Sequence, residues 1–147
     1  WLKSGITGDD TDGHIDEFCR FVGKSKIMLC RCENLEDRNY PILIENRNRL
    51  EQFIKSSEDN WKIVDLPMPE NRSQDGIRLP CSYANFYIAN GVVIVPKFND
   101  PEDSNAAAIL SESFPDREVI GIDSTALAWG LGSFHCLTQQ QPIIQIT

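Results

Sequence analysis

The sequence has 147 residues, of which 41% are hydrophobic and 24% are charged, and this composition indicates a soluble globular domain rather than a disordered chain. Its net charge of −8 argues against nucleic-acid binding, which requires basic surfaces. No apolar run approaches the roughly 20 residues that a membrane span needs, and no basic segment followed by an apolar stretch indicates a secretion signal. We therefore expect a cytoplasmic protein that binds neither nucleic acid nor a membrane.

The five cysteines follow neither the spacing of a disulfide scaffold nor that of a metal site. Their odd number favours the reduced thiols of a cytosolic protein. Cys30 and Cys32 form only a Cys-x-Cys pair inside an apolar run, whereas a zinc site needs about four ligands at characteristic spacing. The sequence therefore predicts no metal ion and no cofactor.

The chain begins with a polar segment rich in glycine and aspartate, residues 1–13, which is the composition of a loop. The first residue is Trp1 rather than Met, and we interpret this as a sequence that begins partway through a larger protein. The run 14–22 follows, and we expect it to be a β-strand. The period of two in a strand would place His14 and Asp16 on the same face.

Residues 27–66 are expected to form a strand–helix–strand unit, with strands at 27–32 and 61–66. The helix between them has Pro41 in its first turn, where proline is tolerated, and is predicted to run to about Ser56. Apolar residues at helical spacing predict the buried stripe of this helix, which consists of Leu43, Leu50, Phe53 and Ile54.

A polar connection and a hairpin are predicted after this unit. Residues 70–80 are polar and charged, which is typical of a flexible loop. The run 82–89 is predicted to be a strand, and Asn90-Gly91 is a strong hairpin-turn signal. The β-branched run 91–96 is then the second strand of the hairpin.

A second strand–helix–strand unit is predicted over residues 92–122. Residues 100–103, Asp-Pro-Glu-Asp, provide a cap, a proline at the first helical position and acids in the first turn. The run 117–122 is predicted to be the closing strand, and 124–129 a short helical turn. Since both units follow one plan, the sequence predicts an α/β fold of quasi-symmetric modules packed around a shared centre.

The segment 130–142 places Cys136 between two glycines and a polar run that ends at Pro142. Glycine allows the backbone to approach a ligand closely, so this segment is suited to presenting a thiol to a cavity. A free cysteine is more often a small buried hydrophobic residue, and the local sequence leaves both interpretations open. Because His14 precedes the first module and Cys136 follows the second, the layout predicts that they meet at one end of the array.

A cysteine nucleophile needs a base or a positive environment, because the thiolate is the reactive form. In an extended segment His135 would point away from Cys136, so we expect His14 to be the general acid and base, with a surface-loop histidine as the alternative. Asp16 is expected to orient the imidazole or to bind a cation, and Asp10 offers a further carboxylate. The residues alone therefore indicate a cysteine-dependent hydrolase with a cationic substrate.

Four stretches resemble motifs of the agmatine deiminases and bacterial-type peptidylarginine deiminases. Residues 8–16, GDDTDGHID, resemble the histidine motif of these enzymes, and residues 82–96 resemble their central hairpin. Residues 114–119, FPDREV, resemble the start of the next strand, and residues 135–142, HCLTQQQP, resemble the cysteine motif. The four matches occur in order over essentially the whole chain.

The resemblance implies a pentein fold, a pseudosymmetric α/β propeller, in which residues 1–147 are the C-terminal part of a single catalytic domain and the N-terminal blades are missing. It implies that Cys136 attacks a guanidinium carbon and forms an amidino-thioether, while His14 protonates the departing ammonia and then activates water. Asp16 would bind the guanidinium, and Asp10 matches an acidic position that contacts substrate. With the small cation agmatine as substrate, the product is N-carbamoylputrescine, in putrescine biosynthesis.

The sequence departs from the family pattern before the cysteine, where the family usually has three glycines and an asparagine. Here the run includes Leu131 and Ser133, which are expected to reshape the pocket, so that agmatine and peptidyl-arginine remain alternative substrates. The resemblance also implies that the first guanidinium-binding aspartate lies in the missing N-terminal part. A different class of function is an inactive fragment or assembly module, which would associate with that part or form a homo-oligomer through exposed sheet edges.

Overall fold

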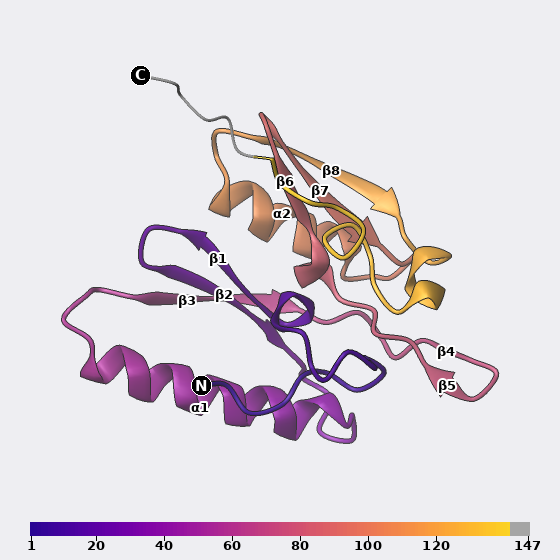
Figure 1. The fold of residues 1–147 in the computed structure, drawn as a ribbon, viewed down its shortest axis with the longest axis horizontal. Coiled ribbons are helices and arrows are strands. Elements are labelled where there is room, and N and C mark those ends of the chain that lie inside the picture. Colours follow the sequence, from indigo (N-terminus) through magenta and orange to yellow (C-terminus); the bar gives the residue numbers. More distant parts are fainter. Residues whose placement is uncertain (142–147) are drawn as a thin grey trace.

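The computed structural model describes residues 1–141, which form two α/β units side by side (Figure 1). The first unit consists of β1 (Cys19–Gly23), β2 (Lys26–Arg31), α1 (Asn39–Ser56) and β3 (Lys62–Pro67). The second consists of β6 (Tyr87–Ala89), β7 (Val92–Lys97), α2 (Asp103–Ser113) and β8 (Glu118–Asp123). The predicted mixed α/β fold with repeated strand–helix–strand units is confirmed.

The two units have the same topology, including a feature that was not predicted. In each sheet an antiparallel hairpin, β1–β2 or β6–β7, is extended by a parallel strand, β3 or β8, which follows the helix. A single 3₁₀ turn precedes each hairpin, η1 (Ile15–Glu17) before β1 and η2 (Tyr83–Asn85) before β6. Each unit is therefore a 3₁₀ turn, two strands, a helix and a third strand.

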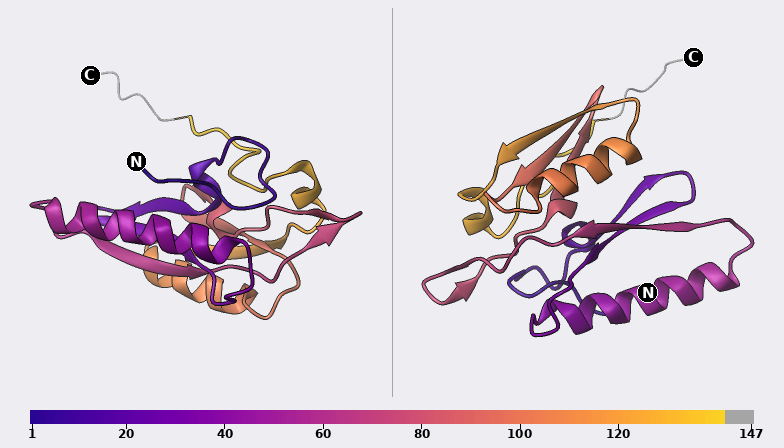
Figure 2. Two further views of the ribbon diagram at one scale, coloured as in Figure 1. Left: turned by 90° about the horizontal axis from the view of Figure 1, so that it is seen from below. Right: turned by 180° about the vertical axis from the view of Figure 1, so that it is seen from behind.

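The two helices occupy different environments (Figure 2). Helix α1 lies on the outer side of the first sheet, whereas α2 lies between the second sheet and the first unit, where it also packs against β3. Among residues 1–141, no helix has the combination of length and apolar character that a membrane span requires.

The expected strand over 14–22 is wrong in its first half, because the chain forms η1 there and β1 begins only at Cys19. The Asp9 carboxylate accepts the backbone N–H of His14, and the His14 carbonyl accepts the N–H of Glu17, which closes the backbone into a turn. The expected strand over 82–89 is interrupted in the same way, since the Ser82 side chain caps η2 by accepting the Ala84 N–H. The side chains of these two turns therefore do not alternate between two faces as they would in a strand.

The expected loop over 70–80 contains a small hairpin made of β4 (Ser73–Gln74) and β5 (Ile77–Arg78). Its turn is formed by Asp75 and Gly76, which both have positive φ. Two short strands of this kind leave too little apolar periodicity for a sequence prediction.

The buried stripe of α1 is half polar. Leu43 and Leu50 are buried as predicted, but Phe53 is 49% exposed and packs beside Trp61, with ring centroids 6.1 Å apart. The remaining positions of the stripe are the buried Asn39 and Asn46, which bind the backbone of the N-terminal segment. Hydrogen bonds of 2.7 to 2.8 Å join them to the backbone of Lys3, Ser4 and Thr7. The helix thus fixes the segment that leads to η1.

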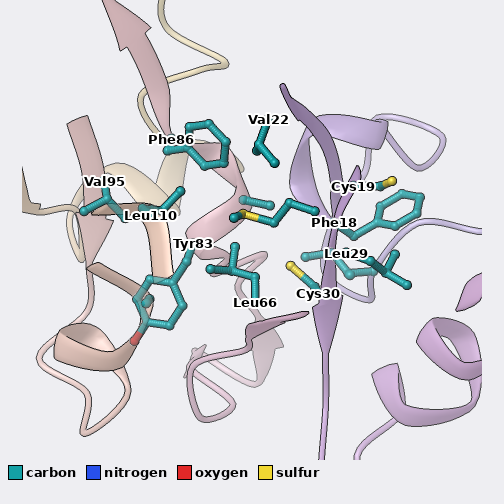
Figure 3. Packing of buried hydrophobic residues seen from close by; sticks show 14 of the residues in the cluster. Phe18, Cys19, Val22, Leu29, Cys30, Leu66, Tyr83, Phe86, Val95 and Leu110 are labelled. Carbon is teal, nitrogen blue, oxygen red and sulfur yellow. The ribbon is translucent and has the colours of Figure 1, made fainter. Parts of the chain in front are cut away.

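One continuous core joins the two units (Figure 3). Buried side chains of the first unit, including Phe18 and Leu66, pack toward those of the second, including Tyr83 and Phe86. Arg20 of β1 also crosses the boundary: its Nη1 donates to the carbonyls of Ala84 and Phe86, each at 2.9 Å, and its guanidinium lies 4.5 Å from the centre of the Phe86 ring. These contacts hold η1 and η2 together.

Candidate functional site

The Cys136 thiol is exposed in a tight turn that follows η3 (Leu127–Gly130) and packs against η2. The Leu137 N–H donates to the Ser133 carbonyl, and the His135 N–H donates to the Asn85 carbonyl at 3.1 Å. The expectation of an extended segment is therefore wrong, and with it the argument that His135 must point away from the site of Cys136. Pro142, which ends the predicted cysteine motif, lies outside the described residues.

Asn85 organises the turn around the thiol. Its Oδ1 accepts the backbone N–H groups of Ser133, His135 and Cys136, at 2.9, 3.1 and 3.3 Å. Its Nδ2 donates to the Cys136 sulfur at 3.0 Å. A buried carboxamide that accepts three backbone N–H groups of one turn fixes both the shape of the turn and the direction of the thiol.

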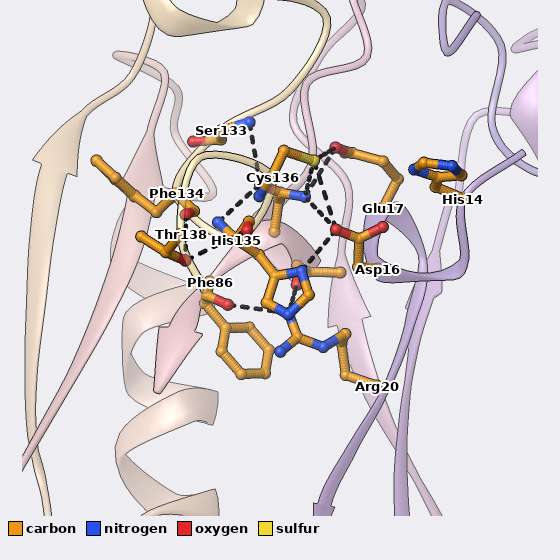
Figure 4. Close-up of polar contacts among 12 residues, drawn as sticks. His14, Asp16, Glu17, Arg20, Phe86, Ser133, Phe134, His135, Cys136 and Thr138 are labelled. Carbon is orange, nitrogen blue, oxygen red and sulfur yellow. Dashed lines mark hydrogen bonds and ion pairs between the residues drawn. The ribbon is translucent and has the colours of Figure 1, made fainter. Parts of the chain in front are cut away.

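Asp16 lies against the same sulfur (Figure 4). Its Oδ2 is 3.4 Å from the Cys136 Sγ, 3.1 Å from the Asn85 Nδ2 and 2.6 Å from the His135 Nδ1. The structure thus brings together Asp16 and Cys136, which the sequence predicts to share a site although they are 120 positions apart.

Glu17 is the second carboxyl group at the thiol, and it was not predicted. Its side chain is 1% exposed, and its Oε1 lies 2.8 Å from the Asn85 Nδ2 and 3.4 Å from the Cys136 Sγ. Its Oε2 is buried and has no hydrogen-bond partner in the part of the chain that the structure describes. The sequence offers only a weak signal for this residue, since a strand over 14–22 would have turned Glu17 away from Asp16.

The two carboxyl groups have opposite electrostatic behaviour. Burial opposes the charge of Asp16, but hydrogen bonds with His135 and Cys136 outweigh it and hold the pKa of Asp16 below its ordinary value. Burial raises the pKa of Glu17 to about 8, and the nearby charges of Asp16 and Asp9 add to this effect. Asp16 is therefore a stable anion, whereas Glu17 holds a proton near neutral pH.

The Cys136 thiol is also neutral in this environment. Partial burial and the neighbouring Glu17 and Asp16 raise its pKa to about 11, against the effect of the Asn85 hydrogen bond. Burial likewise raises the pKa values of Cys19, Cys30 and Cys81, which belong to the core. Cys136 differs from these three thiols in being exposed, which excludes the interpretation as a small buried hydrophobic residue.

The structure does not bring the side chains of His14 and Asp10 to the thiol. His14 is exposed, and Figure 4 shows its ring beyond Glu17 as seen from Cys136. Between the described residues His14 and Cys136 there is no hydrogen bond. Asp10 is exposed and lines a separate shallow hollow with Asp9 and other residues of the same loop. The predicted meeting of His14 and Cys136 thus holds for their segments but not for their side chains.

Three glycines make the close approaches at this site. A Cβ on Gly5 would overlap the Gly13 Cα, so two backbone segments touch at the base of the loop that leads into η1. A Cβ on Gly132 would lie 2.7 Å from the Cys136 Cβ and 2.9 Å from its Sγ. Because Gly132 has no side chain, the Cys136 thiol can occupy this space.

Asp16 and His135 open onto a groove of about 440 Å³. Most of its other lining residues are apolar, including Leu2, Ile15 and Phe21. Arg20 and Arg49 also line the groove, which therefore combines apolar side chains with the Asp16 carboxylate and two guanidinium groups. Among residues 1–141, no three His, Cys, Asp or Glu side chains gather in a way that would hold a metal ion.

Comparisons with known proteins match nearly the whole chain. The family model described as Porphyromonas-type peptidyl-arginine deiminase matches residues 1–142. Agmatine deiminases of Pseudomonas fluorescens Pf-5 and Pseudomonas syringae pv. tomato are 35% and 36% identical to the chain, over 99% and 97% of its length. The chain spans 44% of the length of each of these curated relatives.

Solved structures match over a similar share. A substrate-bound C. jejuni agmatine deiminase superposes with a TM-score of 0.84 and 36% identity, covering 92% of this chain and 39% of that one. A putative arginine deiminase from Porphyromonas gingivalis gives a TM-score of 0.90 and 41% identity, covering 95% of this chain and 41% of that one. The similarity thus extends over nearly all of this chain and less than half of its relatives.

Proposed function

This chain belongs to the family of agmatine deiminases and Porphyromonas-type peptidyl-arginine deiminases, and on that premise we propose that it carries the nucleophile of a guanidine deiminase. In this proposal Cys136 attacks the guanidinium carbon, and Asp16 binds the guanidinium nitrogens. Agmatine is the substrate, and N-carbamoylputrescine and ammonia are the products, which places the reaction in putrescine biosynthesis.

The observation that carries the proposal is the contact of 3.4 Å between the Cys136 sulfur and the Asp16 carboxylate. An anion beside a thiol raises the pKa of the thiol, which would impede attack on a neutral carbonyl. A guanidinium cation bound to Asp16 would neutralise that charge and place its carbon next to the sulfur, with paired hydrogen bonds to the carboxylate. The site therefore suits a cationic electrophile.

The proposed reaction has two halves. The Cys136 thiolate forms the S–C bond, and protonation of one nitrogen releases ammonia and leaves an amidino-thioether. Water then adds to the same carbon, and the C–S bond breaks to give the ureido product and the free thiol. We assign protonation of ammonia and activation of water to His14 from the family resemblance. Among the described residues no hydrogen bond holds the exposed His14 ring.

We further propose that this chain is the C-terminal part of a pentein domain, and that the complete site takes residues from further modules. The coverage of 44% of each relative supports this, as do the apolar side chains that the two units leave exposed. Phe21 of β1 is 70% exposed, and Ile120 and Ile122 of β8 are 40% and 42% exposed. Asp10 is proposed to contact substrate in the complete site. The five free cysteines fit a reducing compartment, and we propose the cytoplasm.

The test is release of ammonia and N-carbamoylputrescine from agmatine. It is carried out with the chain alone and with the chain fused behind the N-terminal part of the P. fluorescens agmatine deiminase. We expect turnover in the fusion and none in its Cys136→Ser variant. Equal turnover in the Cys136→Ser fusion would contradict the nucleophilic role of Cys136, and full turnover by the chain alone would contradict the need for further modules.

Peptidyl-arginine is the second candidate substrate, because the matching family model is that of Porphyromonas-type peptidyl-arginine deiminases. A solved structure described as a putative peptidyl-arginine deiminase, which matches with a TM-score of 0.87 and 36% identity, points in the same direction. Conversion of arginine to citrulline in an unstructured peptide, with agmatine unchanged in parallel reactions, would favour this substrate over agmatine.

A further inference from the structure

Two carboxyl groups lie at equal distances from one sulfur, since Asp16 Oδ2 and Glu17 Oε1 are each 3.4 Å from the Cys136 Sγ. Guanidinium binding requires only one of them, Asp16. The Asp16 Oδ2 also lies within hydrogen-bond distance of the His135 Nδ1 and the Asn85 Nδ2. Glu17 has no part in the reaction as proposed so far, although it is among the most deeply buried side chains of the chain.

The surroundings of Glu17 are poor for a permanent charge. Within residues 1–141, its Oε1 has hydrogen-bond contacts with the Asn85 amide and the thiol, and its Oε2 is buried without a partner. A buried carboxylate with an unsatisfied oxygen carries a large desolvation cost, which is relieved when the group takes up a proton. Glu17 is thus a carboxyl group for which uptake of a proton is favourable, next to the thiol that must lose one.

The charged and titratable groups around Glu17 come from every element that packs on it. They are Asp9 of the N-terminal loop, Asp16 of η1, Arg20 of β1, Cys30 of β2, Cys81 of the segment before η2, and Cys136 of the cysteine turn. Asp9 and Asp16 favour the protonated form of Glu17, whereas Arg20 and the hydrogen bond to Cys136 favour its charged form. Together these opposing effects make the Glu17 carboxyl group ionise close to the pH range in which thiols ionise.

We propose that Glu17 is a further catalytic residue that accepts the thiol proton of Cys136, while Asp16 remains the anion that binds the guanidinium. This inference rests on the proposed nucleophilic role of Cys136. It assigns separate tasks to two neighbouring carboxyl groups whose environments differ, which is a recurrent arrangement for acid–base chemistry.

The proposed steps conserve the Cys136 proton and the electron pairs of the bonds that break. The S–H bond of Cys136 breaks as its proton moves to the ionised Glu17 Oε1, and the sulfur keeps the electron pair. That pair forms the S–C bond to the guanidinium carbon, whose C=N π electrons move to nitrogen, which gives a neutral tetrahedral adduct from a thiolate and a cation. After ammonia leaves and water has added, the C–S bond breaks toward sulfur and the C=O bond forms. Glu17 returns its proton to Cys136, and the hydroxyl proton of the adduct passes to solvent, where it converts the released ammonia to ammonium.

Glu17 and Cys136 are expected to titrate as a pair. Below pH 8 the pair holds two protons, since burial raises the pKa of Glu17 to about 8. Above that pH the pair holds one proton, shared between Oε1 and Sγ, and this is the reactive state. The rate at which Cys136 is alkylated should therefore rise around pH 8, well below the pKa of about 11 of the thiol itself.

The test measures alkylation of Cys136 by iodoacetamide between pH 6 and 10, with the modified peptide quantified by mass spectrometry. The proteins compared are the unmodified chain, Glu17→Gln and, as a matched surface control, Glu118→Gln on the exposed face of β8. We expect Glu17→Gln to slow alkylation at pH 8 at least about tenfold and to move the midpoint to higher pH. We expect Glu118→Gln to behave like the unmodified chain.

The direction in which Glu17→Gln changes the alkylation rate distinguishes a Glu17 that accepts the proton from one that only repels the thiolate. If Glu17 only repelled the thiolate, Glu17→Gln would speed alkylation, so an equal or faster rate would overturn the proposal. Glu17→Asp serves if the glutamine variant fails to fold, because it keeps the charge but withdraws the carboxyl from the sulfur, and we again expect slower alkylation. If Cys136 of the unmodified chain reacts no faster than the partly exposed Cys32 at any pH, the proposed function itself fails, which distinguishes the two outcomes.

Discussion

Glu17 and Asn85 occupy the same position in the two repeated units, and their side chains hydrogen-bond to each other, with Asn85 Nδ2 2.8 Å from Glu17 Oε1. Each is the last residue of a 3₁₀ turn, and each is followed by a fully buried phenylalanine, Phe18 or Phe86. The pseudo-symmetry thus places a carboxyl group and a carboxamide face to face where the units meet. The sulfur of Cys136, from the segment after the second unit, contacts both of these side chains.

Asn85→Ala is predicted to destabilise the chain by about 3 kcal/mol, because it leaves the backbone N–H groups of Ser133 and Cys136 without their acceptor, whereas the His135 N–H keeps the Asn85 backbone carbonyl. The free energy of unfolding in urea measures this effect. Asn85→Asp is the matched comparison, since it retains an acceptor but adds a charge beside Asp16 and Glu17. A loss below about 0.5 kcal/mol in Asn85→Ala would contradict the organising role of Asn85.

Gly132→Ala is predicted to reduce alkylation of Cys136 by iodoacetamide about tenfold or more, because the new methyl group would lie 2.9 Å from the sulfur and displace the thiol. Gly130→Ala, two residues earlier in the same segment, is the control, since a Cβ there meets no atom within 4 Å. Equal rates in the two variants would show that the space beside Gly132 does not determine where the thiol lies.

The sequence predicts the fold well where periodicity is strong and poorly where single side chains shape the backbone. The two strand–helix–strand units and the Asn90-Gly91 turn are confirmed. The turns η1 and η2 were missed because they depend on hydrogen bonds from Asp9 and Ser82, which no periodic pattern records. A local interaction overrode the β-propensity of the flanking residues.

The site was predicted in part for the same reason. Cys136 and Asp16 are in contact as the layout suggests, but Glu17, Asn85 and His135 were missed. Their roles depend on the junction between units, which brings together residues far apart in the chain. One signal was available, because His14-Ile15-Asp16-Glu17-Phe18 and Ser82-Tyr83-Ala84-Asn85-Phe86 occupy equivalent positions of the repeat. Aligning the repeats would have paired Glu17 with Asn85.

The stability of the chain should fall as the pH rises from about 5 to 8, relative to that of Glu17→Gln. Burial raises the pKa of Glu17 from its ordinary 4.5 to about 8, so the folded chain holds a proton in this window that the unfolded chain lacks. Unfolding releases that proton, so higher pH favours unfolding. Each pH unit of the window corresponds to roughly 1.4 kcal/mol at most.

The measurement for this prediction is urea unfolding of both proteins at several pH values. The two proteins share the histidines and all other titrating groups, so these cancel in the difference. A difference in unfolding free energy that stays constant from pH 5 to 8 would contradict a protonated Glu17 in the folded chain.

His14→Ala and His135→Ala separate the two histidines in the fusion that turns over agmatine. We predict that His14→Ala lowers kcat by about 10²–10⁴-fold with little change in thermal stability, because the side chain is exposed. His135→Ala should mainly raise KM, since its ring lies 2.6 Å from the carboxylate that binds the guanidinium. The reverse pattern would assign the acid–base role to His135.

The central claim is that Asp16 directs a cation to the Cys136 sulfur, and the most direct measurement compares two alkylating agents of similar size. The cationic 2-chloroacetamidine and the neutral 2-chloroacetamide are each reacted with Cys136, and their rate ratio is divided by the ratio for a small free thiol. We predict a normalised ratio of about ten or more that falls toward one in Asp16→Asn and persists in Asp59→Asn, a control at an exposed aspartate. A normalised ratio near one in the unmodified chain, or one that Asp16→Asn leaves unchanged, would contradict the claim.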